Sequence, residues 1–121
     1  MSYHYDWLMR QIEAISAILK YIASGERKHA VAIETEAPTV GGGNELYDRL
    51  QTLVAQGQYC RAEDLLFEML ETPSYPVLDA AQQFYEDLNR LPDETLEEHN
   101  FSREEILEGL QTVSQRFGIS L

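Results

Sequence analysis

The chain has 121 residues, of which 44% are hydrophobic and 25% are charged. This length and composition fit one folded domain and exclude wholesale disorder, because enough apolar surface is present to offset the entropy of ordering the chain. The formal net charge is −12, which repels phosphate backbones and anionic lipid headgroups and makes nucleic acid a poor partner.

The number of cysteines and the hydropathy of the sequence predict the cellular compartment of the protein. Cys60 is the only cysteine, so no disulfide within the chain and no thiolate metal cluster can form. The first ten residues lack the pattern of a secretory signal, and no stretch reaches the roughly 18 apolar residues of a membrane span. The sequence therefore predicts a cytoplasmic protein with no membrane span.

A first helix is predicted from about residue 5 to residue 23, with Gly25 as its C-terminal cap. Its apolar residues recur at alternating spacings of four and three, which is helical periodicity. They are Leu8, Ile12, Ile15, Leu19 and Ile22. Further residues widen this stripe beyond what a surface helix usually needs: Trp7, Ala14, Ile18 and Tyr21.

The periodicity disappears over residues 26–43. A short extended piece over residues 30–33, Pro38 and three consecutive glycines at 41–43 are typical of a flexible linker. The predicted organisation is an N-terminal amphipathic helix over 1–25, a flexible linker over 26–43 and a helical bundle over 44–121, in one domain overall.

Two helices are predicted between Asn44 and Pro73. Asn44 is a suitable N-cap for the first, which Gly57 ends, and Pro73 limits the second. Because the connection between two amphipathic helices is so short, we expect an antiparallel hairpin.

The remainder of the chain is also predicted to be helical. Ser74 caps a helix that ends at Pro92, and a short acidic segment follows over 93–99. Ser102 and Glu105 form a Ser-x-x-Glu capping box for a last helix that Gly118 closes. The predicted fold class is all-α, a compact bundle of about five to six helices with a central repeat-like antiparallel helical hairpin.

The hairpin contains Gly57-Gln58-Tyr59-Cys60-Arg61-Ala62, then Leu65-Leu66 and Pro73, and this run resembles the turn and second helix of a tetratricopeptide repeat. Glycine lets the chain reverse, and the small alanine lets the helices approach. The first helix departs from the repeat, with Arg49-Leu50 where leucine then glycine would stand. We interpret the two helices between Asn44 and Pro73 as one repeat-like hairpin inside a bundle.

Three longer segments, over residues 5–13, 62–68 and 98–106, are similar to a family of small uncharacterised proteins from Gram-positive bacteria. The resemblance covers nearly the full length. It implies an all-helical fold and a bacterial cytoplasm, and it brings no activity, ligand, cofactor or catalytic residue.

No residue pattern indicates catalysis or metal binding. His4, His29 and His99 lie in different segments without partners at ligand spacing, so solvated surface histidines are expected. Cys60 has a neighbouring Arg61, which lowers a thiol pKa, but no base is indicated beside it. The glycines at 41–43 lack the lysine of a phosphate loop. The acidic stretch over 86–108 is a solvated face or a surface for a basic partner.

The first helix carries the main functional hypothesis. Seven residues are predicted as an interface: Trp7, Leu8, Ile12, Ile15, Ile18, Leu19 and Ile22. The alternatives are a central core helix wrapped by the bundle and a helix lying on a membrane surface, although its polar face has no cationic excess. The leading hypothesis is a non-enzymatic protein that binds a protein partner or itself, as a homodimer, through residues 5–23. The second is a small ligand-binding or enzymatic bundle with a pocket lined by Tyr47, Tyr59, Tyr85 and acidic residues.

Overall fold

The computed structural model describes the backbone of residues 2–33 and 42–119, and the side chains of residues 4–23 and 45–119. Every regular element in these ranges is an α-helix, and the predicted all-α bundle is confirmed. The six helices are α1 (Ser2–Ile33), α2 (Gly42–Ala55), α3 (Tyr59–Met69), α4 (Tyr75–Asn89), α5 (Asp93–Glu98) and α6 (Arg103–Arg116).

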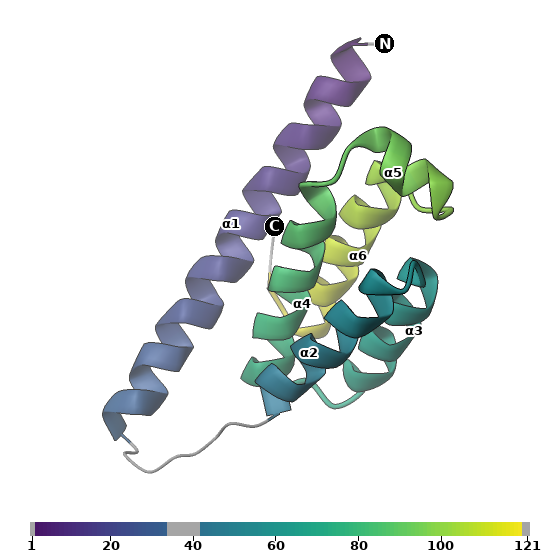
Figure 1. Ribbon diagram of the computed structural model, residues 1–121. Coiled ribbons are helices and arrows are strands. Elements are labelled where there is room, and N and C mark those ends of the chain that lie inside the picture. The colour runs from purple at the N-terminus through teal and green to yellow at the C-terminus, as the bar shows by residue number, and fades with distance from the viewer. Residues whose placement is uncertain (1, 34–41, 120–121) are drawn as a thin grey trace.

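Helix α4 lies in the middle of the bundle and contacts α1, α2, α3 and α6. Helix α1 is a long rod that crosses α4 and α6 and extends past the rest of the bundle (Figure 1). Helices α2 and α3 form the predicted antiparallel hairpin on the other side of α4 (Figure 1). Short α5 lies at the end of the bundle toward the start of α1 (Figure 1).

Helix α1 is longer than the sequence predicted. The predicted C-cap at Gly25 and the extended piece over residues 30–33 are wrong, because the backbone stays helical to Ile33. A glycine inside a helix costs only about 1 kcal/mol, and the residues after it are mostly good helix formers with no proline before position 38. The rest of the predicted linker, residues 34–41, lies outside the described residues.

The start of α2 also differs from the prediction. Asn44 is not the N-cap, because the helix already begins at Gly42. Glycine is accepted at helix starts, so the first helical residue moves from 45 to 42, by three residues. The end agrees with the prediction: Gly57 has φ +78°, a conformation that glycine adopts without strain, and the Gln58 N–H donates to the Leu53 carbonyl at 2.9 Å.

The two predicted serine caps are present. The Ser74 hydroxyl accepts a hydrogen bond from the Val77 N–H at 3.4 Å, and the Ser102 hydroxyl accepts one from the Glu105 N–H at 3.2 Å. Among the described residues, the Glu105 side chain does not return the second bond of the capping box, and its Oε1 atom is buried without a hydrogen-bond partner.

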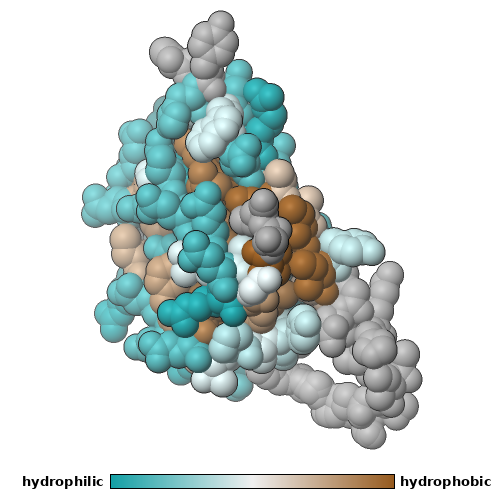
Figure 2. Space-filling view, turned by 180° about the vertical axis from the view of Figure 1, so that it is seen from behind, coloured by the Kyte–Doolittle hydropathy of each residue, from teal (hydrophilic) through white to brown (hydrophobic). Residues whose placement is uncertain are grey.

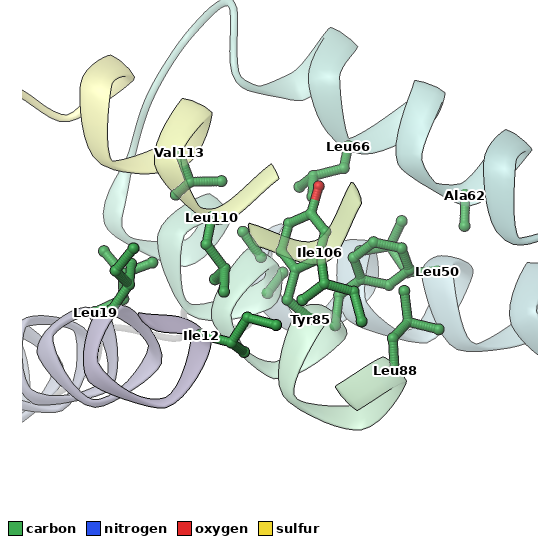
Figure 3. Packing of buried hydrophobic residues seen from close by; sticks show 14 of the residues in the cluster. Ile12, Leu19, Leu50, Ala62, Leu66, Tyr85, Leu88, Ile106, Leu110 and Val113 are labelled. Atoms are coloured by element: carbon green, nitrogen blue, oxygen red, sulfur yellow. The ribbon is translucent and has the colours of Figure 1, made fainter. Parts of the chain in front are cut away.

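One hydrophobic core joins all six helices. Figure 3 shows Ile12 and Leu19 of α1 beside Leu110 of α6 and the ring of Tyr85 of α4. Each of these four side chains is fully buried. Helix α1 therefore shares the core of the bundle.

Arg103 ties the ends of three helices together, and the sequence analysis missed it. Its guanidinium donates to the Asn89 carbonyl at 2.7 Å and the Leu91 carbonyl at 2.6 Å. It also donates to the Asn89 side-chain oxygen and to Asp93 Oδ1 at 2.9 Å. Arg103 is buried although it is charged, which is tolerated because four of its five N–H donors form the hydrogen bonds just described.

Replacing Arg103 with lysine is expected to lower the free energy of unfolding by about 2 kcal/mol, because an ammonium cannot reproduce the planar set of donors. Urea unfolding measures the change. Arg90→Lys is the matched control, since Arg90 is exposed and forms only surface ion pairs with Glu86 and Asp87. Equal losses in the two variants would contradict this role of Arg103.

Candidate interaction surface

The inner face of α1 packs on the body of the protein. Leu8, Ile12, Ile15 and Leu19 are buried, and Ile22 is partly buried against the same core. The helices beneath them are α4 and α6. Because these spacings of four and three keep one face of a helix toward a neighbour, this stripe fixes α1 in place.

A second stripe on α1 is displaced by one residue from the first. It consists of Trp7, Gln11, Ala14, Ile18 and Tyr21, and we call it the outer seam. Its spacings are four, three, four and three, the pattern of the a and d positions of a coiled coil. One residue is about 100° of helical rotation, so the outer seam lies beside the buried stripe and faces sideways from the contact with the core.

The outer seam is exposed. Trp7 is 49% exposed, Ile18 40% and Tyr21 80%, while Ala14 is exposed and Gln11 is half-buried. Figure 2 shows one face of the molecule, on which hydrophobic residues gather in the middle and hydrophilic residues surround much of them. Large apolar side chains left in the solvent at coiled-coil spacing are typical of a surface that receives another helix.

The seven residues predicted as an interface therefore separate into two groups. Leu8, Ile12, Ile15 and Leu19 belong to the core, as the core-helix alternative expected, and Ile22 lies at its edge. Trp7 and Ile18 lie in the outer seam, which the interface hypothesis requires. Sequence reasoning treated both groups as one wide stripe. The sequence does contain a pattern that distinguishes the two groups: each follows its own spacing of four and three, and the two series are offset by one residue.

Charge is balanced along this part of α1. Residues 4–23 contain two acidic side chains, Asp6 and Glu13, and two basic ones, Arg10 and Lys20. The net charge of −12 therefore belongs to the rest of the chain. Two polar surface contacts with the body lie along α1: His4 Nε2 is 3.3 Å from Glu104, and Lys20 Nζ forms an ion pair with Glu86 at 3.6 Å.

The two histidines whose side chains the structure describes, His4 and His99, do not form a site together. His4 is exposed, and the side chain of His29 lies outside the described residues. His99 is not the solvated histidine that was expected: its ring stacks on Tyr59 with centroids 4.4 Å apart, and Nδ1 lies 2.8 Å from the Thr95 carbonyl. In the part of the chain that the structure describes, no group of three His, Cys, Asp or Glu side chains is placed to hold a metal ion.

The thiol of Cys60 is not activated. Desolvation and the carboxylates of Glu105 and Glu63 raise its pKa, so the neighbouring Arg61 does not dominate as the sequence suggested. A thiol with a raised pKa carries little thiolate at neutral pH and is a weak nucleophile. We assign Cys60 no chemical role.

A buried hydroxyl and a carboxylate meet between α3 and α4. The Tyr85 hydroxyl donates to Glu63 Oε2 at 2.6 Å, and the Tyr85 side chain is completely buried. Burial, opposed by this hydrogen bond and assisted by repulsion from Glu105, raises the pKa of Glu63. Burial also raises the pKa of Tyr85 well above its usual value, so its hydroxyl stays protonated. This pair fixes the orientation of the Tyr85 ring in the core.

Replacing Glu63 with glutamine is expected to stabilise the protein at neutral pH, by about 1 kcal/mol or less. Glutamine resembles the protonated carboxyl group and still accepts from Tyr85. The folded pKa of Glu63 lies above its unfolded value, so its contribution to stability is present below that unfolded value, near pH 4, and is lost as the pH rises through the folded pKa. Urea unfolding should give similar values for the two proteins near pH 4 and a more stable variant near pH 7. A variant that is less stable at pH 7 would contradict this.

Two hollows lie beside α2. A groove of about 540 Å³ between α2 and α3 is lined by Arg49, Thr52, Leu53, Arg61, Asp64, Leu65 and Glu68. A hollow of about 280 Å³ between α2 and α4 is lined by Tyr47, Gln51, Val54, Ala55, Phe84, Asp87, Leu88 and Leu91. At its edge the Tyr47 hydroxyl donates to Asp87, and burial together with this carboxylate raises the pKa of Tyr47 to about 12.

Of the three tyrosines predicted to line a pocket, the structure brings only Tyr47 to one of these hollows. Tyr59 and Tyr85 are buried in the core. The acidic residue beside Tyr47 is Asp87.

A family model matches residues 2–118, almost the whole chain. The chain belongs to DUF6483, a family of unknown function. No curated protein matches this DUF6483 member significantly, and no solved structure does. Among the described residues, none of its helices combines the length and the apolar character needed to cross a membrane.

Proposed function

We propose that this chain is a non-enzymatic helical interaction protein that self-associates through the outer seam of α1. The observation that carries the proposal is the exposed heptad pattern of Trp7, Ile18 and Tyr21 on a helix whose adjacent stripe is already packed. A helix with two adjacent apolar stripes is suited to lie between two neighbours, and the part of the body that the structure describes supplies only one of them.

Charge favours α1 as the place where a second copy makes contact. Two identical molecules of net charge −12 repel each other over most of their surfaces. Residues 4–23 carry no net charge, so contact along α1 brings the smallest local repulsion.

Three further predictions from the sequence are part of this proposal. They are a bacterial cytoplasm, a Gram-positive source and a tetratricopeptide-like character of the α2–α3 hairpin. The last is supported by the left-handed Gly57 and by the burial of Tyr59 and Ala62, two residue types that the repeat pattern places in packed positions.

Multi-angle light scattering over a wide range of concentrations tests self-association. We expect a change from monomer to dimer, and Ile18→Glu is expected to weaken it about 100-fold or more, because a carboxylate would be buried in the interface. Gln111→Glu adds the same charge to an exposed position of α6 and should leave the association unchanged. A chain that stays monomeric at all concentrations would end the proposal.

Trp7 gives an independent measurement. It is the only tryptophan, and about half of its surface is exposed in the single chain. Its fluorescence emission is therefore expected to move to shorter wavelengths over the concentrations at which the mass doubles. Association without a change of Trp7 emission would place the contact elsewhere on the molecule.

The α2–α4 hollow favours a second candidate, a ligand-binding bundle. Apolar side chains such as Phe84 and Leu91 line it, and the Tyr47–Asp87 pair lies at its edge. Its volume of about 280 Å³ is at or below the lower end for ligand sites, which places this candidate second. A thermal shift of several degrees with a small molecule, lost in Val54→Trp, would promote it.

A further inference from the structure

We propose that two copies pair their α1 helices antiparallel, with Ala14 on the two-fold axis. This inference rests on the proposed function and specifies its geometry. Each copy would place the outer seam of α1 against the same seam of the other, as the self-complementary interface of a two-fold dimer requires.

The outer seam has nearly the same pattern in both directions. Trp7 and Tyr21 each lie seven residues from Ala14, about 10 Å along the helix. In an antiparallel pair centred on Ala14, Trp7 therefore lies opposite Tyr21 of the second copy, and Gln11 lies within one residue, about 1.5 Å, of the level of Ile18. Aromatic side chains meet at both ends, and the two alanines meet at the centre.

Ala14 suits the position on the axis. It is exposed in the single chain, and its small side chain lets two helix axes approach closely there. Gln11 is the polar member of the seam, and a single polar residue at such a position sets the register of a helix pair. In the antiparallel register, each Gln11 lies beside an apolar Ile18 at the edge of the contact and keeps its amide near solvent.

The distribution of charge favours an antiparallel over a parallel pair of α1 helices. Acidic residues gather near the start of α1: Glu104 pairs with His4, and Asp93 and Glu97 line a hollow with Tyr5. A parallel pair would bring two such acidic ends to the same level. An antiparallel pair places them at opposite ends, and it also aligns the helix dipoles favourably.

Helix α1 is already ordered for this contact. A seam of fifteen residues is short for two isolated peptides, because helices of that length are marginal in water. Here the inner stripe of Leu8, Ile12, Ile15 and Leu19 holds the helix on the body. Pairing therefore needs little further ordering of the backbone, which favours association through a short seam.

Disulfide cross-linking in a Cys60→Ser background tests the geometry, because it leaves the introduced cysteines as the only thiols. Cysteines form a disulfide when their Cα atoms lie within about 4.4–6.8 Å. We expect Ala14→Cys to form linked dimers on mild oxidation, about tenfold more than Glu13→Cys, which lies on another side of α1. Gln11→Cys alone should stay at the level of that control, and the double variant Gln11→Cys/Ile18→Cys should be linked efficiently.

The other outcomes overturn the inference in distinguishable ways. Efficient linking of Gln11→Cys alone, equal to that of Ala14→Cys, would show a parallel pair. A dimer by light scattering in which none of the seam cysteines is linked would place the interface elsewhere. A monomer by light scattering for the Cys60→Ser protein and the unmodified chain would remove the proposed function together with this geometry.

Discussion

Replacing Gly109 with alanine is expected to destabilise the protein by about 3 kcal/mol. At an ordinary helix position, replacing glycine with alanine stabilises the protein by about 1 kcal/mol. The sign of the change in the free energy of unfolding therefore already tests the prediction. A Cβ atom at position 109 would lie 2.2 Å from the Tyr85 hydroxyl oxygen and 2.3 Å from Cζ of that ring. The ring has no room to move away, because it is completely buried and hydrogen-bonded to Glu63.

A double-mutant cycle identifies the cause. In a Tyr85→Leu background the additional Gly109→Ala change is expected to cost almost nothing, because the group that it meets is gone. Gln111→Ala, at an exposed position of the same helix, should change the free energy of unfolding by less than about 0.5 kcal/mol. Urea unfolding measures the four proteins of the cycle and the Gln111→Ala control. A Gly109→Ala protein as stable as the wild type would show that α4 and α6 separate easily.

The second large effect is expected for Ile12→Glu on α1. Ile12 has no exposed surface, so the change buries a carboxylate in the core and should cost about 4 kcal/mol or more. Ile18→Glu places the same side chain six residues along, at a position that is 40% exposed. There we expect a change of less than about 1 kcal/mol in the monomer.

Circular dichroism during urea unfolding compares the two variants, at a concentration where the wild type is monomeric. Light scattering at higher concentration completes the comparison: Ile18→Glu should be folded but no longer associate. Equal destabilisation by both substitutions would mean that the outer seam is also part of the core of one chain.

Helix positions were largely predictable from the sequence because the apolar spacing is regular. Ser74 and Ser102 cap α4 and α6 as their sequence patterns indicate, and Gly57 ends the hairpin turn. The boundaries of α1 and α2 were less predictable. Gly25 predicts the end of α1 at that position, but the helix continues, because a single glycine is a weak helix breaker when helix formers surround it.

The candidate surface was only partly predictable. Periodicity shows that Trp7 and Ile12 are apolar residues of the same helix, but it does not show which of two adjacent stripes meets the body. That choice depends on the shape of α4 and α6, which no local pattern in α1 describes. The Tyr85–Glu63 pair and the contacts of Arg103 join residues that are distant in the sequence, so they became visible only in the folded chain.

The bonds of Arg103 have a consequence for the dynamics of the smallest helix. Six residues are too few to hold a helix in water, so α5 owes its order to its anchors at Leu96 in the core and at the Arg103–Asp93 contact. Its amides, including the His99 N–H that donates to the Leu96 carbonyl, should exchange with deuterium at rates near those of the neighbouring helix ends. The end of the bundle from Asn89 to Arg103 would then open as one cooperative unit.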